Sequence, residues 1–244
     1  MHKSKISIIH PSRNRVSRAV KAYDLVVANA RSGIDIQYVL SIDTDDESCN
    51  EYLKAFKNKC NVIVNHNKSA IEAINNGASV TDGDILMVMS DDFDDMPLGW
   101  DNMILEATAG REFWVLKTFD KTQKWIITMP IMDRKFYKTF GYIYNPDYTH
   151  MFCDTELATI CDMLDCVIVR NDIVFPHNHY TNGYEKDPIN DRNDLSWKQG
   201  EEMYFKRLKE NFGLKHPDAL RSIRDNGHVE WVKNQFHKYK ERKF

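Results

Sequence analysis

Four carboxylates lie within five positions directly after an apolar run. Ile85–Met89 is continuously apolar, and Asp91, Asp92, Asp94 and Asp95 follow it. Many acidic stretches are only solvated loops. Carboxylates held close together at the end of a buried strand repel one another, however, and this repulsion favours a bound cation. Oxygen ligands suit Mg²⁺ or Mn²⁺, so we expect one of these two ions at this point of the chain.

The elements that must position these carboxylates follow a regular order. Hydrophobic periodicity over residues 5–90 predicts β-α-β-α-β-α-β, and therefore a mainly parallel sheet with right-handed crossovers. Ligands of such sheets bind beyond the carboxyl ends of the strands. Polar segments stand at four of those ends, namely His10–Arg13, Asp43–Asp46, Asn65–Lys68 and Asp91–Asp95. We expect these four loops to meet at one edge of the sheet.

Within this half, the predicted strands are 6–9, 34–42, 61–65 and 85–89, and the predicted helices are 16–30, 48–58 and 68–78. Ser12 or Asn14 can supply the N-cap of the first helix, and Gly33 can end it. The continuous apolar run of the fourth strand is typical of a strand that is buried on both faces.

The second half has a less regular pattern. Residues 113–117 and 125–131 are expected to form strands that pair antiparallel, 155–164 a helix, and 166–169 and 173–175 short strands. Residues 181–200 are polar and rich in Asn, Gly and Pro, which predicts a long loop able to act as a mobile lid. Helices are expected over 201–213 and 219–240. With neither repeats nor a linker, residues 1–244 are predicted to form a single domain.

The composition excludes several classes of protein. The net charge of −3 argues against strong duplex binding, although residues 197–244 carry twelve Lys or Arg against seven Asp or Glu. No segment approaches the ~20 apolar residues of a membrane span. The five cysteines show no CxxC pair or zinc-finger spacing, so we expect free thiols and a cytoplasmic protein.

Several motifs, taken together, are similar to those of the GT-A class of glycosyltransferases, near the large family 2 that uses nucleotide-sugar donors. The opening segment HPSRNR, residues 10–15, resembles that family's nucleotide-binding loop, and Ser90-Asp91-Asp92-Phe93 resembles its DxD motif. The resemblance implies an α/β, Rossmann-like GT-A fold with a mainly parallel sheet flanked by helices. Its parts would be a nucleotide-sugar half (1–95), a smaller antiparallel acceptor half (96–180), and a lid loop with C-terminal helices (181–244).

The resemblance also implies roles for individual residues. Asp92 would bind Mn²⁺ or Mg²⁺, together with His177 or His179 from the segment VFPHNHY, and Asp91 would face the ribose of the donor. The two histidines are two positions apart, so an extended segment would point both to the same side. The other implied donor contacts are Pro11, Ser12, Arg13, Asp43 and Lys68.

A glycosyltransferase also needs a base that removes the proton of the acceptor hydroxyl. The segment HMFCDTELA, residues 150–158, resembles the family's acidic motif at a helix start. The match assigns the base to Asp154, with Glu156 as the second candidate. A plain helix N-cap is the competing interpretation of Asp154.

The resemblance predicts an inverting, metal-dependent enzyme that transfers a sugar, most simply from a UDP-sugar, to the hydroxyl of a glycan, a small molecule or a modified nucleic acid. A nucleotidyltransferase is one alternative, although HPSRNR lacks the glycines of the usual phosphate loop. A sugar-nucleotide-binding module without catalysis is another.

Overall fold

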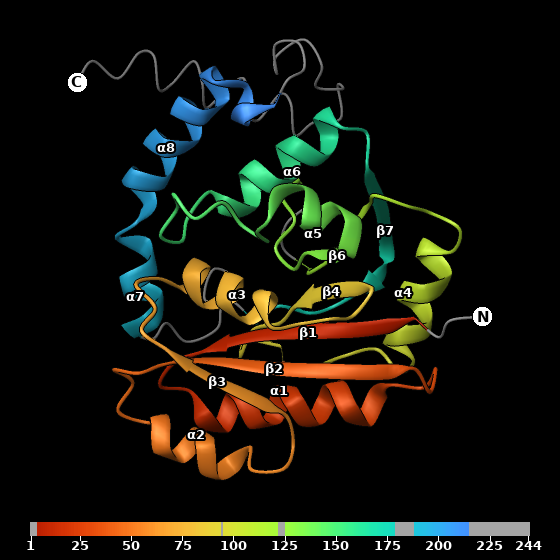
Figure 1. The fold of residues 1–244 in the computed structure, drawn as a ribbon, viewed down its shortest axis with the longest axis vertical. Coiled ribbons are helices and arrows are strands. Elements are labelled where there is room, and N and C mark those ends of the chain that lie inside the picture. Colours follow the sequence, from red (N-terminus) through yellow and green to blue (C-terminus); the bar gives the residue numbers. More distant parts are fainter. Residues whose placement is uncertain (1–3, 94, 122–124, 179–187, 215–244) are drawn as a thin grey trace.

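A computed structural model describes residues 4–93, 95–121, 125–178 and 188–214. Its seven-stranded sheet has the order β3-β2-β1-β4-β6-β5-β7 (Figure 1). The strands are β1 (Lys5–Ser12), β2 (Asp35–Asp43), β3 (Asn61–Asn65), β4 (Ile85–Val88), β5 (Val115–Phe119), β6 (Ile131–Asp133) and β7 (Val167–Val174). Among the strands in the described ranges, only the short β6 runs antiparallel to its neighbours, β4 and β5.

Helices pack on both faces of this sheet. They are α1 (Val16–Asn29), α2 (Cys49–Ala55), α3 (Ala70–Ser79), α4 (Trp100–Thr108), α5 (Arg134–Phe140), α6 (Cys153–Met163), α7 (Pro188–Asp194) and α8 (Trp197–Lys209), with a 3₁₀ turn at Asn211–Gly213. In Figure 1, α1 and α2 lie below the strands β1 and β2, while α3, α5 and α6 lie above these two strands.

The side chains of β1 point alternately to the two faces of the sheet, and apolar residues on both faces explain why helices cover both. Ile6 and Ile8 face the cluster that contains Trp100 of α4, whereas Ile9 faces the opposite cluster with Ile74 of α3. All three isoleucines are fully buried. Successive strand residues point to opposite faces, so a central strand covered on both sides reads as continuously apolar.

The predicted order of the first half is confirmed, with element ends shifted by a few residues. The parallel pairs β1–β2, β2–β3 and β1–β4 place the ends of the four strands at one edge. The β1–β4 ladder ends at Ile9 and Val88, so Pro11 lies beyond it and its missing N–H costs no bond to β4.

The strands of the second half differ from the prediction at two places. Residues 125–130 form no strand, and β6 begins only at Ile131. The two predicted pieces at 166–175 are one strand, β7, which pairs parallel to β5. In the described sheet, antiparallel pairing with β5 is therefore limited to Ile131 and Met132 of β6.

The long loop predicted over 181–200 is wrong for residues 188–200. These residues form α7 and the start of α8. Pro188 occupies the first position of α7, where its fixed φ angle suits a helix and its missing N–H costs no bond. The remainder of that loop, the helix expected at 219–240 and most of the basic C-terminal part lie outside the described residues.

All five cysteines are described, and each is a free thiol, as predicted. None of the helices in the described ranges combines the length and the apolar character that a membrane span requires.

Candidate active site

The four polar loops meet at the carboxyl edge of the sheet, as predicted. Arg13 after β1 reaches Asp43 at the end of β2, with 2.7 Å between Nη1 and Oδ2. Asn67 after β3 donates to the same Asp43 carboxylate at 2.7 Å. Ser12, at the end of β1, donates to Asp91 after β4. These contacts join all four loops into one polar site.

Asp91 lies at the centre of a buried hydrogen-bond network. Its carboxylate, only 5% exposed, accepts from Nε2 of His10 at 2.9 Å and from the Ser12 hydroxyl at 2.9 and 3.0 Å. Nδ1 of His10 pairs with the Tyr38 hydroxyl at 2.6 Å, and the Ser12 hydroxyl pairs with that of Tyr52 at 2.6 Å. Hydrogen bonds from His10 and Ser12 of β1 thus fix the orientation of the Asp91 carboxylate.

This network also explains how α1 begins. The prediction that Ser12 or Asn14 caps the helix is wrong, because Arg15 is the N-cap residue and makes no side-chain capping bond. The Ser12 hydroxyl is instead turned toward Asp91. The backbone N–H of Arg15 donates to the Tyr52 hydroxyl at 2.9 Å, which connects the helix start to the same network.

Arg13 holds the loop after β2 in place. Besides Asp43, its Nη1 lies 2.6 Å from Oδ1 of Asp45. The bond to Asp45 and the field of Asp43 raise the pKa of the guanidinium, although burial opposes this shift. Lys68 is exposed at the rim, where its backbone N–H donates to Glu72 in the first turn of α3.

Asp92 faces basic side chains. Oδ2 lies 3.1 Å from Nη1 of Arg15 and 3.9 Å from Nε2 of His177, and Oδ1 lies 3.3 Å from Nη1 of Arg18. Burial alone would raise the pKa of Asp92, but His177, Arg15 and Arg18 together outweigh it and lower the pKa. Arg15 ends the segment HPSRNR that resembles the nucleotide-binding loop, but neither it nor Arg18, in the first turn of α1, was predicted to contact Asp92.

His177 is brought to Asp92 by a local backbone pairing. Phe93 and His177 form an isolated antiparallel bridge, and the N–H of Asn178 donates to the carbonyl oxygen of Asp92 at 2.9 Å. The ring of His177 stacks on Phe93 with 5.2 Å between centroids. His179, the second predicted histidine, lies outside the described residues.

The pair Asp92 and His177 fits a divalent metal ion. A carboxylate and an imidazole are both ligands for Mn²⁺, and a hard cation of this kind fills its remaining positions with phosphate or water oxygens. Across the described ranges, no three or more His, Cys, Asp or Glu side chains gather into a metal cage. An ion held by only two protein ligands has positions left for the oxygens of a phosphate-bearing ligand.

Asp154 lies in the first turn of α6, after a strained residue. The N-cap of α6 is Phe152, whose φ of 71° is unusual for a residue other than glycine, so the interpretation of Asp154 as an N-cap is wrong. Oδ1 of Asp154 accepts from the N–H of Thr155 at 2.8 Å. Burial, with a smaller contribution from the charge of Asp120, raises the pKa of Asp154 to about 6.

Asp120 contacts the backbone of His177 and was not predicted from the sequence. It is 3% exposed and directly follows β5, so an acid at a strand end was the available signal. Its carbonyl oxygen accepts from the N–H of His177 at 3.1 Å, and its carboxylate accepts from Thr128 at 2.8 Å. Its charge also acts on Asp154.

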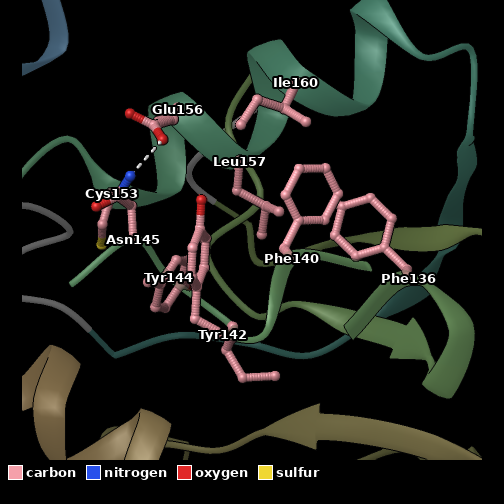
Figure 2. A pocket seen from close by; sticks show the side chains of 10 residues that line it. Phe136, Phe140, Tyr142, Tyr144, Asn145, Cys153, Glu156, Leu157 and Ile160 are labelled. Atoms are coloured by element: carbon pink, nitrogen blue, oxygen red, sulfur yellow. Dashed lines mark hydrogen bonds between the residues drawn. The ribbon is translucent and has the colours of Figure 1, made fainter. Parts of the chain in front are cut away.

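Glu156, the second candidate for the base, is enclosed by other side chains. It is 2% exposed and accepts from Nε and Nη2 of Arg207, at 2.7 and 2.8 Å, and from the Tyr148 hydroxyl at 2.7 Å. Figure 2 shows its bond to Asn145, beside a cavity lined by Tyr142, Tyr144 and Leu157. The cavity holds about 10 Å³, the lower limit for one water, so no substrate fits there.

The comparison with family models decides the class of protein. The model described as "Glycosyl transferase family 2" matches residues 7–168, about two thirds of the chain. The chain belongs to glycosyl transferase family 2. The matched range of this family 2 glycosyltransferase contains all four polar loops and Asp154, and ends before His177.

Solved structures agree with this assignment at the level of the fold, which is GT-A. TarS of S. aureus superimposes with a TM-score of 0.63 at 10% identity, over 96% of this chain and 43% of that one. The family 2 chain thus spans less than half the length of that relative. Glucosyl-3-phosphoglycerate synthase of Mycobacterium tuberculosis superimposes with a TM-score of 0.62 at 12% identity, over 84% of this chain and 80% of the other. No curated protein matches the sequence.

Proposed function

We propose that this protein is a metal-dependent, inverting glycosyltransferase. It transfers a sugar from a nucleotide-diphosphate sugar, with UDP as the nucleotide, to an acceptor hydroxyl. The observation that carries the proposal is the placement of Asp92 and His177 at the ligand edge of the sheet, with Asp154 linked to them through Asp120. The same proposal expects a cytoplasmic enzyme.

The donor lies along the edge formed by the four loops. Asp43 and Arg13 recognise the base side, with Pro11, Ser12 and Lys68 around them, and Asp91 stands beneath the ribose. Two structural relatives support UDP as the nucleotide, because TarS and glucosyl-3-phosphoglycerate synthase were both solved in complex with it.

Asp92 and His177 hold the metal ion. The relative from M. tuberculosis was solved with Mn²⁺ beside UDP, which supports a divalent ion of this kind. When bound, the ion supplies Lewis-acid stabilisation of the charge that develops on the leaving diphosphate.

Asp154 performs the proton transfer. A carboxyl group with a pKa of about 6 is mostly ionised at neutral pH, and it is a stronger base than an ordinary aspartate. Its carboxylate accepts the acceptor's hydroxyl proton while the acceptor oxygen bonds to the anomeric carbon. The bond from that carbon to the diphosphate oxygen breaks, and the diphosphate leaves with the electron pair. A single displacement inverts the configuration at the anomeric carbon.

The first test is a thermal-shift panel with UDP, GDP, CDP, ADP and their sugars, each with Mn²⁺, with Mg²⁺ or with EDTA. A ligand at 100-fold its Kd adds about 2.7 kcal/mol to the free energy of unfolding, which gives a clear shift of Tm. We expect stabilisation by UDP or a UDP-sugar that depends on the metal. Lack of response to every nucleotide would contradict the proposal.

The second test follows sugar transfer, or hydrolysis of the donor sugar that the panel selects, in Asp92→Asn and Asp154→Asn. Both variants should lose at least about a hundredfold in rate, the usual contribution of a catalytic base or metal ligand. Asp147→Asn, at an exposed position seven residues before Asp154, is the matched control and should keep its rate. If Asp92→Asn and Asp154→Asn retain full turnover, the proposed mechanism is wrong. Metal-dependent donor binding without turnover on any acceptor would indicate a binding module.

A further inference from the structure

The predicted metal ligand Asp92 is already engaged by two cations of the chain itself. Arg15 and Arg18 place Nη1 atoms 3.1 and 3.3 Å from its two carboxylate oxygens. The Asp92 and Arg15 side chains are 12% and 10% exposed, whereas Arg18 is 45% exposed. The ion pair with Arg15 is thus largely shielded from water, and that with Arg18 lies nearer the surface.

A metal ion added to this cluster alone would be repelled. The two guanidinium groups carry two positive charges against the single negative charge of Asp92, and a divalent ion would add two more. Like charges a few ångströms apart at a partly buried site cost several kcal/mol even at an effective dielectric constant of about 20. A diphosphate would offset this excess, and guanidinium groups bind phosphate oxygens with two parallel hydrogen bonds.

Arg13, the arginine that the resemblance assigned to the donor, is held elsewhere. Its Nη1 lies 2.7 Å from Asp43 and 2.6 Å from Asp45, beneath the expected position of the base. Arg15 and Arg18 are therefore the arginines that stand next to the carboxylate expected to hold the metal.

We propose that Arg15 and Arg18 form the diphosphate site, and that in the free enzyme they occupy the Asp92 carboxylate and oppose metal binding. When the donor arrives, the two guanidinium groups move from Asp92 to the diphosphate oxygens, and the released carboxylate joins His177 as a metal ligand. Metal and diphosphate then bind cooperatively. The diphosphate draws the two guanidinium groups away from Asp92, which frees this carboxylate for the metal, and the positive charge of the metal favours binding of the diphosphate. The inference rests on the proposed function and adds the phosphate-binding residues and the order of events.

The test measures Mn²⁺ binding to the full-length protein by electron paramagnetic resonance of the free ion. It is done with protein alone, with UDP and with inorganic pyrophosphate, after correction for Mn²⁺ complexes formed without protein. For wild type we expect weak binding of Mn²⁺ alone and about tenfold tighter binding with UDP or pyrophosphate, with the reciprocal gain for UDP when Mn²⁺ is present.

The arginine variants distinguish this coupling from ordinary metal binding. Arg15→Gln and Arg18→Gln should bind Mn²⁺ alone more tightly than wild type, and should bind UDP without metal about tenfold more weakly. Arg18→Gln removes a half-exposed side chain, so it keeps the test decisive if Arg15→Gln does not fold. Arg170→Gln, which removes a partly exposed guanidinium paired with Asp172, is the control and should match wild type.

Three results would overturn the proposal. If UDP binds with Mn²⁺ but the arginine variants equal wild type, the inference fails and the proposed function stands. If the variants bind Mn²⁺ alone more weakly, the arginines support the metal site instead of opposing it. If neither UDP nor pyrophosphate binds wild type with Mn²⁺, the proposed function and the inference fail together.

Discussion

His10 donates from Nε2 to Oδ1 of Asp91 at 2.9 Å, in the fully buried layer beneath the site. The same ring accepts from or donates to the Tyr38 hydroxyl through Nδ1. Loss of one partner from a buried, hydrogen-bonded charge costs far more than loss of an exposed contact. We therefore expect His10→Ala to lower the free energy of unfolding by about 3 kcal/mol, measured by urea denaturation.

Tyr38→Phe serves as the graded comparison for His10→Ala. It removes only the hydroxyl from the far side of the ring and should cost about 1 kcal/mol. Equal effects of the two changes, or an effect of His10→Ala below about 0.5 kcal/mol, would show that Asp91 does not depend on His10.

The raised pKa of Asp154 predicts a dependence of activity on pH. The base acts only when ionised, so kcat/KM should fall tenfold per pH unit below about 6, as protonation proceeds, and level off above it. A profile of kcat/KM from pH 4.5 to 8.5 checks this prediction. An activity that stays constant from pH 8 to pH 5 would assign the base to another group.

The same pKa predicts an effect of pH on stability that needs no substrate. The folded-state pKa is raised from 3.8, so the folded protein binds the proton more tightly than the unfolded chain, and stability falls as pH rises through the interval from about 4 to 6. Asparagine resembles the neutral carboxyl. We expect Asp154→Asn to raise the free energy of unfolding by roughly 2 kcal/mol at pH 8 and to leave it nearly unchanged at pH 3.5.

Asp147→Asn is again the control for the stability measurement, because that carboxylate is largely exposed. It should change stability little at either pH. If Asp154→Asn destabilises the protein at pH 8, the folded protein stabilises the charged Asp154 carboxylate. The prediction that its pKa is raised would then be wrong.

Gly200 in α8 packs directly against the turn that precedes Asp154. A Cβ atom at this position would collide with the carbonyl oxygen of Met151 and lie 3.2 Å from the ring of Phe152. Overpacking of this kind costs about 1–3 kcal/mol. We expect Gly200→Ala to lower the Tm and the rate of transfer, because the strained turn shifts, while the Kd for UDP stays near that of wild type.

Lys206→Ala is the matched control for Gly200→Ala, since it changes an exposed position of the same helix. It should leave both the Tm and the rate near wild type. A Gly200→Ala protein with an unchanged Tm and rate would show that the turn tolerates the shift.

The ion pair of Glu156 with Arg207 joins α6 to α8 near the catalytic turn. Arg207→Met leaves Glu156 buried without its cation, and we expect a loss of about 3–5 kcal/mol in urea denaturation. The double variant Glu156→Gln, Arg207→Met removes the charge as well and should recover part of this loss. Strictly additive effects in the double-mutant cycle would contradict a direct coupling of the two residues.

Local patterns were sufficient to predict the half of the molecule that carries the donor. The alternating and continuous apolar runs of β1 to β4, and the helical spacing between them, lead directly to a parallel sheet. Because parallel strands end at a common edge, the positions of Asp43, Asp91 and Asp92 near one another followed from the order of elements alone.

The partners of each charged group depended on distances that only the tertiary structure sets. Arg13 and Arg15 are two residues apart and look equivalent in the sequence, yet one turns to Asp43 and the other to Asp92. Asp154 and Glu156 are also two residues apart. Burial raises the pKa of Asp154. Glu156 is instead paired with Arg207, which lies on a helix about fifty residues later in the chain.

The sequence by itself thus determined the β-α order, the edge at which ligands bind and the family of the enzyme, because hydrophobic periodicity and short motifs are local properties of the chain. The tertiary structure alone decided that α8 supports the turn before Asp154, that His177 reaches Asp92 and that Arg15 and Arg18 occupy the same carboxylate. These contacts join residues 45 to more than 80 positions apart, and packing across such separations leaves no local signal in the sequence.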